Sequence, residues 1–194
     1  MCRSKFALNY SPSEHYNPMF PELFENEKII FIRVINECLR FSYDCEGLYN
    51  SHTVLNCVRI DNLRSAKHSS AKKACKGKNK KDFEFISQYS MKFILGILNS
   101  KLINWYFMTF MSDGLNFYPD NAKQLPLIDI REAVVNQEEI ISLVDRIIQG
   151  KSVGKSTADY EKQLDSIIYH IYGLSDDEMR IIDAQDEMRI IDAQ

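Results

Sequence analysis

The sequence predicts an α+β fold: a small, mainly antiparallel sheet with packed helices, followed by a C-terminal helical hairpin. Residues 27–60 hold several short runs rich in β-branched and aromatic residues, a composition typical of strands. Residues 90–111 and two segments between 136 and 172 carry apolar residues at helical spacing. A chain of 194 residues is long enough to bury a sizeable core among these elements.

The strands are expected early in the chain. Residues 1–26 contain three prolines and few periodic apolar residues, and we interpret them as an irregular lead-in that is the end of a longer protein. Residues 28–34 predict a buried strand and residues 39–43 a second one. Gly47 suits the following turn because glycine readily adopts a positive φ. Residues 48–60 form the third predicted strand region.

The middle of the chain is strongly basic. Eight basic residues occur there without an intervening Asp or Glu: Arg64, Lys67, Lys72, Lys73, Lys76, Lys78, Lys80 and Lys81. The whole chain has a formal net charge of -3, so this positive charge is local and indicates contact with a polyanion. Because residues 62–81 have almost no apolar side chains, they predict an exposed, mobile loop.

Helices are expected after the basic segment. Residues 90–111 predict two consecutive helices, with Ser100 as the N-cap of the second and Trp105 packed in the core. Residues 116–130 contain two prolines and predict strand and loop. One amphipathic helix is predicted from a cap at Asn136 to Gly150, and another over 157–172, and the two are expected to pack as a hairpin.

The last residues of the chain repeat a nonapeptide. Residues 177–185 read DEMRIIDAQ, and residues 186–194 are identical. Repeat architectures need longer units and at least three copies, so this duplication predicts no repeat fold. Ser175 and the acidic residues after it predict a short final helix, to which we assign no function.

The residues show no catalytic motif and no sign of membrane insertion. The sequence lacks GxSxG, GxGxxG, Walker, HExxH and CxxC patterns. Five cysteines without paired spacing indicate reduced thiols in a cytosolic protein rather than disulfides or zinc ligands. No apolar run reaches 18 residues, and the N-terminus has no signal-peptide pattern.

Two short segments invite comparison with catalytic sites. Asn17-Pro18-Met19-Phe20 is similar to the Asn-Pro-Pro-Tyr/Phe tetrapeptide of amino-methyltransferases, but the second proline is missing and no apolar strand precedes it. Tyr118-Pro119-Asp120 with Lys123 is similar to a nuclease metal site, but the second carboxylate that would hold Mg²⁺ is absent. We interpret the first as coincidence and the second as a turn.

The basic segment is the feature of the sequence that still indicates a function once the catalytic motifs are set aside. Clustered Lys and Arg release counterions on meeting phosphates, which gives affinity for nucleic acid of any sequence. The alternative is a solvated, disordered insertion, and composition does not separate the two. Arg33, Arg40 and Arg59 lie in or beside the predicted strands and are candidates to read guanine edges in a bidentate manner.

Five segments in the same order resemble the TaqI-like C-terminal specificity domain, and together they cover residues 20–182. The segments are Pro21–Phe24 with Glu27–Arg33, Tyr43-Asp44 with Gly47 and Tyr49, Leu95–Phe107, Leu125–Leu127 with Ile140–Ile148, and Leu164–Leu174. The resemblance implies the target-recognition domain of a bacterial, cytoplasmic type II restriction–modification enzyme. Such a domain binds double-stranded DNA and has no catalytic centre of its own.

The resemblance also implies partners and a division of the chain. The catalytic work would belong to a methyltransferase or nuclease domain of the same or a companion protein, where S-adenosylmethionine and Mg²⁺ are expected, with no cofactor in this chain. Residues 27–133 would form the recognition globule with the basic loop 62–81. Residues 134–176 would form the hairpin, which either docks the catalytic partner or closes the domain's own core, and residues 177–194 the duplicated tail.

All eleven basic residues named above are candidate DNA contacts under this interpretation. A rival interpretation is a protein-interaction module whose basic loop binds an acidic partner, and it predicts no preference for a DNA sequence. A hidden nuclease is a third hypothesis, and it predicts Mg²⁺-dependent cleavage by the chain alone.

Overall fold

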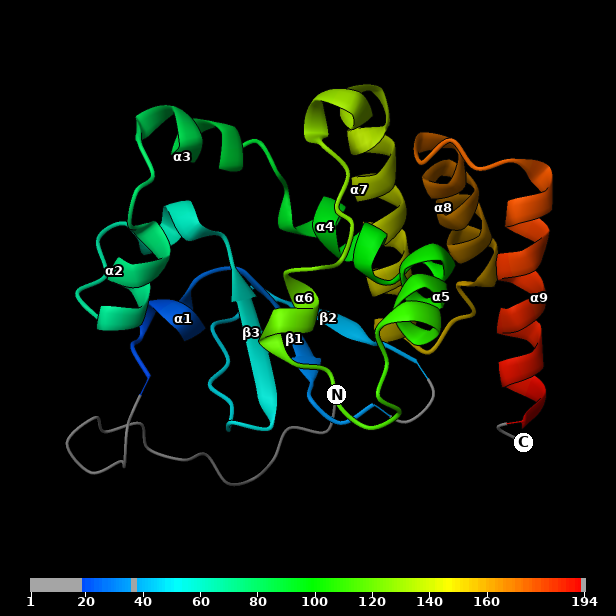
Figure 1. Ribbon diagram of the computed structural model, residues 1–194, viewed down its shortest axis with the longest axis horizontal. Helices are drawn as coiled ribbons and strands as arrows, with labels where there is room; N and C mark the ends of the chain where they lie inside the picture. Colours follow the sequence, from blue (N-terminus) through cyan, green and yellow to red (C-terminus); the bar gives the residue numbers. More distant parts are fainter. Residues whose placement is uncertain (1–18, 36–37, 193–194) are drawn as a thin grey trace.

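The computed structural model describes residues 19–35 and 38–192 (Figure 1). Its strands are β1 (Lys28–Ile32), β2 (Phe41–Asp44) and β3 (Val54–Val58). Its helices are α1 (Glu22–Glu25), the 3-10 helix η1 (Ile60–Leu63), α2 (Ser69–Cys75), α3 (Lys80–Ile86), α4 (Met91–Leu98), α5 (Lys101–Phe110), α6 (Pro119–Ala122), α7 (Ile130–Ser152), α8 (Ala158–Ile171) and α9 (Asp176–Asp192). Helices packed beside one small antiparallel sheet confirm the predicted α+β class.

The three strands form a sheet in the order β2-β1-β3, and both pairings are antiparallel. Phe31 in the central strand lies opposite Phe41 of β2 and Leu55 of β3, which fixes the register. Each strand lies within or beside its predicted range. Residues 116–130 were predicted to be strand and loop, but their pairing is limited to a single bridge between Val34 and Asn116, after which Pro119 begins α6.

One face of the sheet closes the main hydrophobic core. Side chains alternate between the two faces of a strand, so Ile29 and Phe31 of β1 share a face with Phe41 of β2, and all three are buried. Helix α4 packs on this face, and α7 and α8 pack behind it (Figure 1). Trp105 packs against the same core, as predicted.

The two long helices α7 and α8 pack together as the predicted hairpin, but α7 begins and ends elsewhere than expected. Its N-cap is Asp129, whose carboxylate accepts the backbone N–H of Arg131, rather than Asn136. Burial of Ile130 and Ala133 stabilises the added first turn. Gly150 does not end the helix, which continues to Ser152. It lies where a Cβ would come within 2.5 Å of the Thr157 side chain, so this glycine permits close packing of the hairpin.

The ends of the described chain are also more helical than expected. Residues 22–25 of the predicted lead-in form α1, whose Phe24 is buried. The predicted short final helix is the 17-residue α9, which continues from the first copy of the nonapeptide into the second, as far as Asp192. In the first copy, Ile182 is buried in the main core and Asp183 pairs with Lys101, with an Nζ–Oδ1 distance of 3.0 Å.

The basic segment is not the mobile loop that its composition predicted. It forms η1, α2 and α3. A second small core of Phe20, Leu63, Ala66 and Ala71 holds η1 and α2, and α3 packs against η1. Small alanine side chains are enough to dock a short helix, and the aromatic ring comes from a part of the chain about forty residues earlier. Composition alone could not reveal this long-range contact.

A buried ion pair joins the sheet to the segment that covers it. Lys28 and Asp44 lie opposite each other in β1 and β2, are almost fully buried, and form a salt bridge. The Lys28 ammonium also donates to the Phe24 carbonyl at the end of α1. The Asp44 carboxylate accepts the backbone N–H groups of Glu46 (2.8 Å) and Leu48 (3.0 Å), which closes the turn at Gly47. Every charge in this buried group therefore has a partner.

Candidate nucleic-acid interface

Seven lysines of the basic segment are exposed on α2, α3 and the residues around these helices. We call Lys67, Lys72, Lys73, Lys76, Lys78, Lys80 and Lys81 the lysine surface. In α2, Ala71 is fully buried and Cys75 partly so, which turns the lysines of the helix outward. Within the described residues, only Lys80 of this set has an acidic partner, the exposed Glu84 at 3.5 Å.

Local contacts give the lysine surface a defined shape. Asn79 caps α3 by accepting the N–H groups of Lys81 (2.8 Å) and Asp82 (3.3 Å), and the Asp82 carboxylate accepts the N–H of Asn79 in return. Gly77, with φ of 79°, makes the turn between α2 and α3. The Arg64 guanidinium lies over the ring of Phe83, 4.7 Å from its centroid, so this basic residue packs α3 against η1.

Arg59 joins two segments of the protein and has a structural role. Its guanidinium forms a bidentate pair with Asp61, at 3.0 and 3.1 Å, and donates to the carbonyls of Ser87 (3.3 Å) and Tyr89 (3.0 Å). These bonds tie the end of β3 to the connection between α3 and α4. Because its donors are already used inside the protein, we leave Arg59 out of the interface proposed below.

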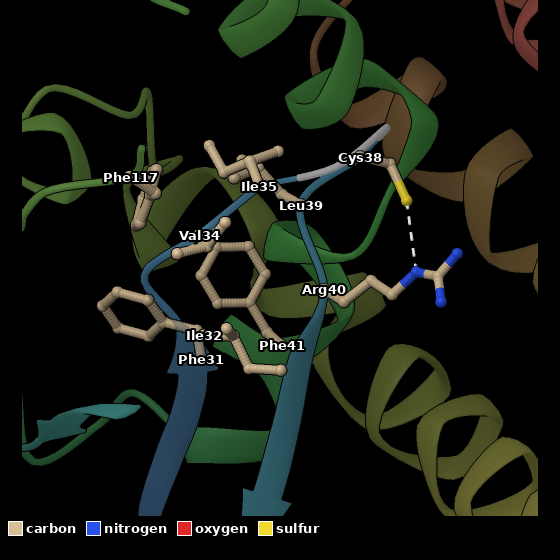
Figure 2. A pocket seen from close by; sticks show the side chains of 9 residues that line it. All are labelled: Phe31, Ile32, Val34, Ile35, Cys38, Leu39, Arg40, Phe41 and Phe117. Atoms are coloured by element: carbon tan, nitrogen blue, oxygen red, sulfur yellow. Dashed lines mark hydrogen bonds between the residues drawn. The ribbon is translucent and has the colours of Figure 1, made fainter. Parts of the chain in front are cut away.

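Arg33 and Arg40 lie at the opposite end of the sheet from the lysine surface. Lys28 pairs with Val58, which leads into Arg59 and η1, whereas Ile32 pairs with Val54 at the other end. Arg33 follows Ile32 and Arg40 precedes Phe41, so both arginines stand where β1 and β2 separate. The Arg33 guanidinium lies over the ring of Tyr118 at 4.9 Å, and Arg40 Nε donates to Cys38 Sγ at 3.3 Å (Figure 2).

Two asparagines hold the backbone on either side of Arg40. Asn104 accepts the N–H of Leu39 (2.8 Å) and donates to its carbonyl (3.2 Å). Asn99 does the same for Phe41, with both distances 3.0 Å. The two side-chain amides thereby bond the outer backbone edge of β2 and of the residues before it, as a neighbouring strand would. We call Asn99 and Asn104 the asparagine clip. Ser100 lies between them and caps α5, as predicted, by accepting the N–H of Ile103.

A hollow of about 340 Å³ opens beside the clip, where β1 and β2 separate (Figure 2). Three phenylalanines support it: the rings of Phe31 and Phe41 both pack edge-on against Phe117, with centroids 5.1 and 5.7 Å away. Arg40 is the charged residue among those that line it, within the described part of the chain. The hollow is therefore lined by phenylalanine rings and by the side chain of Arg40.

A comparison with protein families decides the identity of this arrangement. Residues 3–127, more than half of the chain, match the TaqI-like C-terminal specificity domain. The chain belongs to this family. The match confirms the resemblance noted in the sequence, although it begins earlier than residue 20 and ends before α7. Curated proteins offer no match.

Within this TaqI-like specificity domain, the matched region holds the sheet, the lysine surface, the asparagine clip and the hollow. A specificity domain serves DNA recognition in restriction–modification enzymes and is not itself catalytic. No group of three or more His, Cys, Asp or Glu residues in the described ranges is arranged to hold a metal ion. Asn17 and Pro18 of the methyltransferase-like tetrapeptide lie outside the described residues, and Asp120 pairs with Lys123 at 2.6 Å within the turn of α6.

Other surfaces of the specificity domain carry less information about function. The apolar side of the α7–α8 hairpin, including Ile140, Val144, Leu164 and Ile168, is buried in the main core, which favours the interpretation that the hairpin closes the domain itself. Among the described helices, none is both long enough and apolar enough to cross a membrane. The division into domains stays a prediction.

Proposed function

We propose that this chain selects the DNA target of a restriction–modification enzyme, and so directs adenine methylation, cleavage or both by a separate catalytic domain. Membership of the specificity-domain family supports the DNA-recognition role. The observation that carries the proposed contact is the lysine surface. Its seven ammonium groups are exposed, and among the described residues only that of Lys80 pairs with a carboxylate.

The lysine surface suits contact with a phosphate backbone. Lys72 lies in the last turn of α2, and Lys76 is the C-cap residue that follows the helix. Lysines gathered on one short segment repel one another, and binding a polyanion removes that repulsion. Lysines give affinity without reading sequence, because phosphates are the same at every base pair.

The chemistry itself is assigned to a partner. S-adenosylmethionine and Mg²⁺ belong, in this proposal, to a methyltransferase or nuclease domain of the same or a companion protein. The chain described here supplies binding and orientation of double-stranded DNA.

The test is binding of a labelled DNA duplex across a series of salt concentrations. The variant changes Lys72, Lys73 and Lys76 to Gln, and its matched control changes Lys151, Lys155 and Lys162, which are exposed on or between α7 and α8, to Gln. Both variants lose the same charge. Each phosphate contact contributes about 0.9 to the slope of log affinity against log salt.

We expect the α2 variant to lower that slope by about 2 to 3, with the control close to wild type. Equal effects of the two variants would mean that only net charge matters, and would contradict a located interface. Absence of duplex binding by the wild-type chain at low salt would contradict the proposal and favour an acidic protein partner.

A further inference from the structure

The sheet has a second face that the helices cover only at one end. The side chains of Lys28, Ile30 and Ile32 point away from the main core, as do their partners in β2 and β3. At the Lys28 end this face is covered by α1 and by the small core that anchors α2, which includes Val58, the partner of Lys28. The opposite end has no such cover within the described residues.

The uncovered end combines apolar and basic side chains. Ile32 is 64% exposed and Val34 is 54% exposed, although both belong to the central strand or its continuation. Arg40 and Ser42 are exposed in and beside β2, and Val54 is partly exposed on β3. We call Ile32, Val34, Arg40, Ser42 and Val54 the open face. A sheet that faces water on one side normally presents polar residues there, so exposed aliphatic side chains at the end of its central strand indicate a contact surface.

The charge of the open face favours a nucleic acid as its partner. Arg40 is its charged residue, and no acidic side chain belongs to the set. The backbone on both sides of Arg40 is fixed by the asparagine clip. A guanidinium presented from a fixed backbone suits bidentate contact with guanine, and aliphatic side chains suit contact with the methyl group of thymine.

The open face and the core that anchors α2 lie on the same side of the sheet. Val58 shows this, because it belongs to both that core and that side. The five residues of β1 run from one end to the other over about 13 Å at the usual rise of a strand. That length is about two fifths of a turn of B-DNA.

We propose that the open face enters a groove of duplex DNA and reads base edges, while the lysine surface holds the phosphate backbone beside it. The major groove admits an element about as wide as a two-stranded ribbon, and most of the open face belongs to β1 and β2, with Val54 of β3 beside them. Arg40 and Ile32 are its specificity-determining residues. This inference rests on the proposed function, and it adds where the sequence is read.

The experiment selects duplexes from a random pool with the full chain and then measures affinity for the selected and for an unrelated duplex. The open-face variant carries Ile32→Thr and Arg40→Gln, and its matched control carries Ile181→Thr and Arg180→Gln on α9, where both residues are also exposed. Thr retains the β-branched shape that suits a strand, and circular dichroism checks that every variant is folded.

We expect the open-face variant to lose about ten- to a hundredfold of its preference for the selected duplex, with non-specific affinity changed much less. The α2 lysine variant should instead weaken binding to both duplexes alike. The control should match wild type in both respects.

Three results would overturn the proposal. The first is a wild-type chain that binds duplex DNA without any sequence preference. The second is an open-face variant that prefers the selected duplex as strongly as wild type does. A variant that keeps wild-type DNA binding but loses self-association in analytical ultracentrifugation would make the open face a protein interface. Failure of the proposed function is recognised separately, because wild type would then bind no duplex at all.

Discussion

The asparagine clip provides the most direct test of how the fold presents Arg40. Replacement of Asn104 by Ala removes two hydrogen bonds to the backbone of Leu39, a residue that is 4% exposed. Each buried backbone group that is left without a partner costs about 1–3 kcal/mol. Partial hydration at the edge of β2 offsets some of this, so we expect a loss of about 2–4 kcal/mol in the free energy of unfolding.

The assay is urea unfolding followed by circular dichroism, with the same measurement on Gln163→Ala, which removes an exposed amide from α8. The control should change the free energy of unfolding by about 0.5 kcal/mol or less. A loss below about 0.5 kcal/mol for Asn104→Ala would refute the reasoning. It would show that water or a shifted strand satisfies Leu39 as well as the amide does.

Two further predictions concern the packing of α4 and the turn before α6. Gly96→Ala should lower the free energy of unfolding by about 1–3 kcal/mol in urea titrations, since the new Cβ would lie 2.9 Å from Ile140 and 3.1 Å from Val144; a gain in stability would show that α7 shifts freely. Hydrogen bonds from the backbone N–H groups of Asn116 and Leu115 lower the pKa of Asp113, so its stabilisation of this turn is present above about pH 4 and is lost as pH falls through the lowered pKa. The protection factors of the amides of residues 115–116, which correct for the slower intrinsic exchange in acid, should therefore fall on acidification. Asp113→Asn, which keeps an acceptor but does not titrate, should show no such step.

The parts of the fold that depend on local sequence could be predicted. Helices α4 and α5 follow from apolar spacing, and their boundary follows from Ser100, whose hydroxyl caps the next residues of the chain. The strands follow from β-branched runs. These signals are contained in a few neighbouring residues, so no knowledge of the tertiary structure is needed to interpret them.

The parts that depend on distant partners could not be predicted. Helix α2 looks like a loop until Phe20 is known to lie against Leu63 and Ala71. From the sequence alone, Arg59 is a candidate to contact bases. The structure shows that its guanidinium instead donates to the carbonyls of Ser87 and Tyr89. The open face was missed for a related reason, because alternation along β1 shows that Ile32 and Phe31 point to opposite sides but not which side remains uncovered.

The asparagine clip has a consequence for changing the DNA sequence that this domain selects. Its bonds go to the backbone of residues 39 and 41, not to the side chain between them. The clip therefore does not depend on which side chain stands at position 40, and the side chain at position 42 is exposed. Libraries randomised at these two positions should retain the native structure in most members, which makes the edge of β2 a suitable starting point for engineering new specificities.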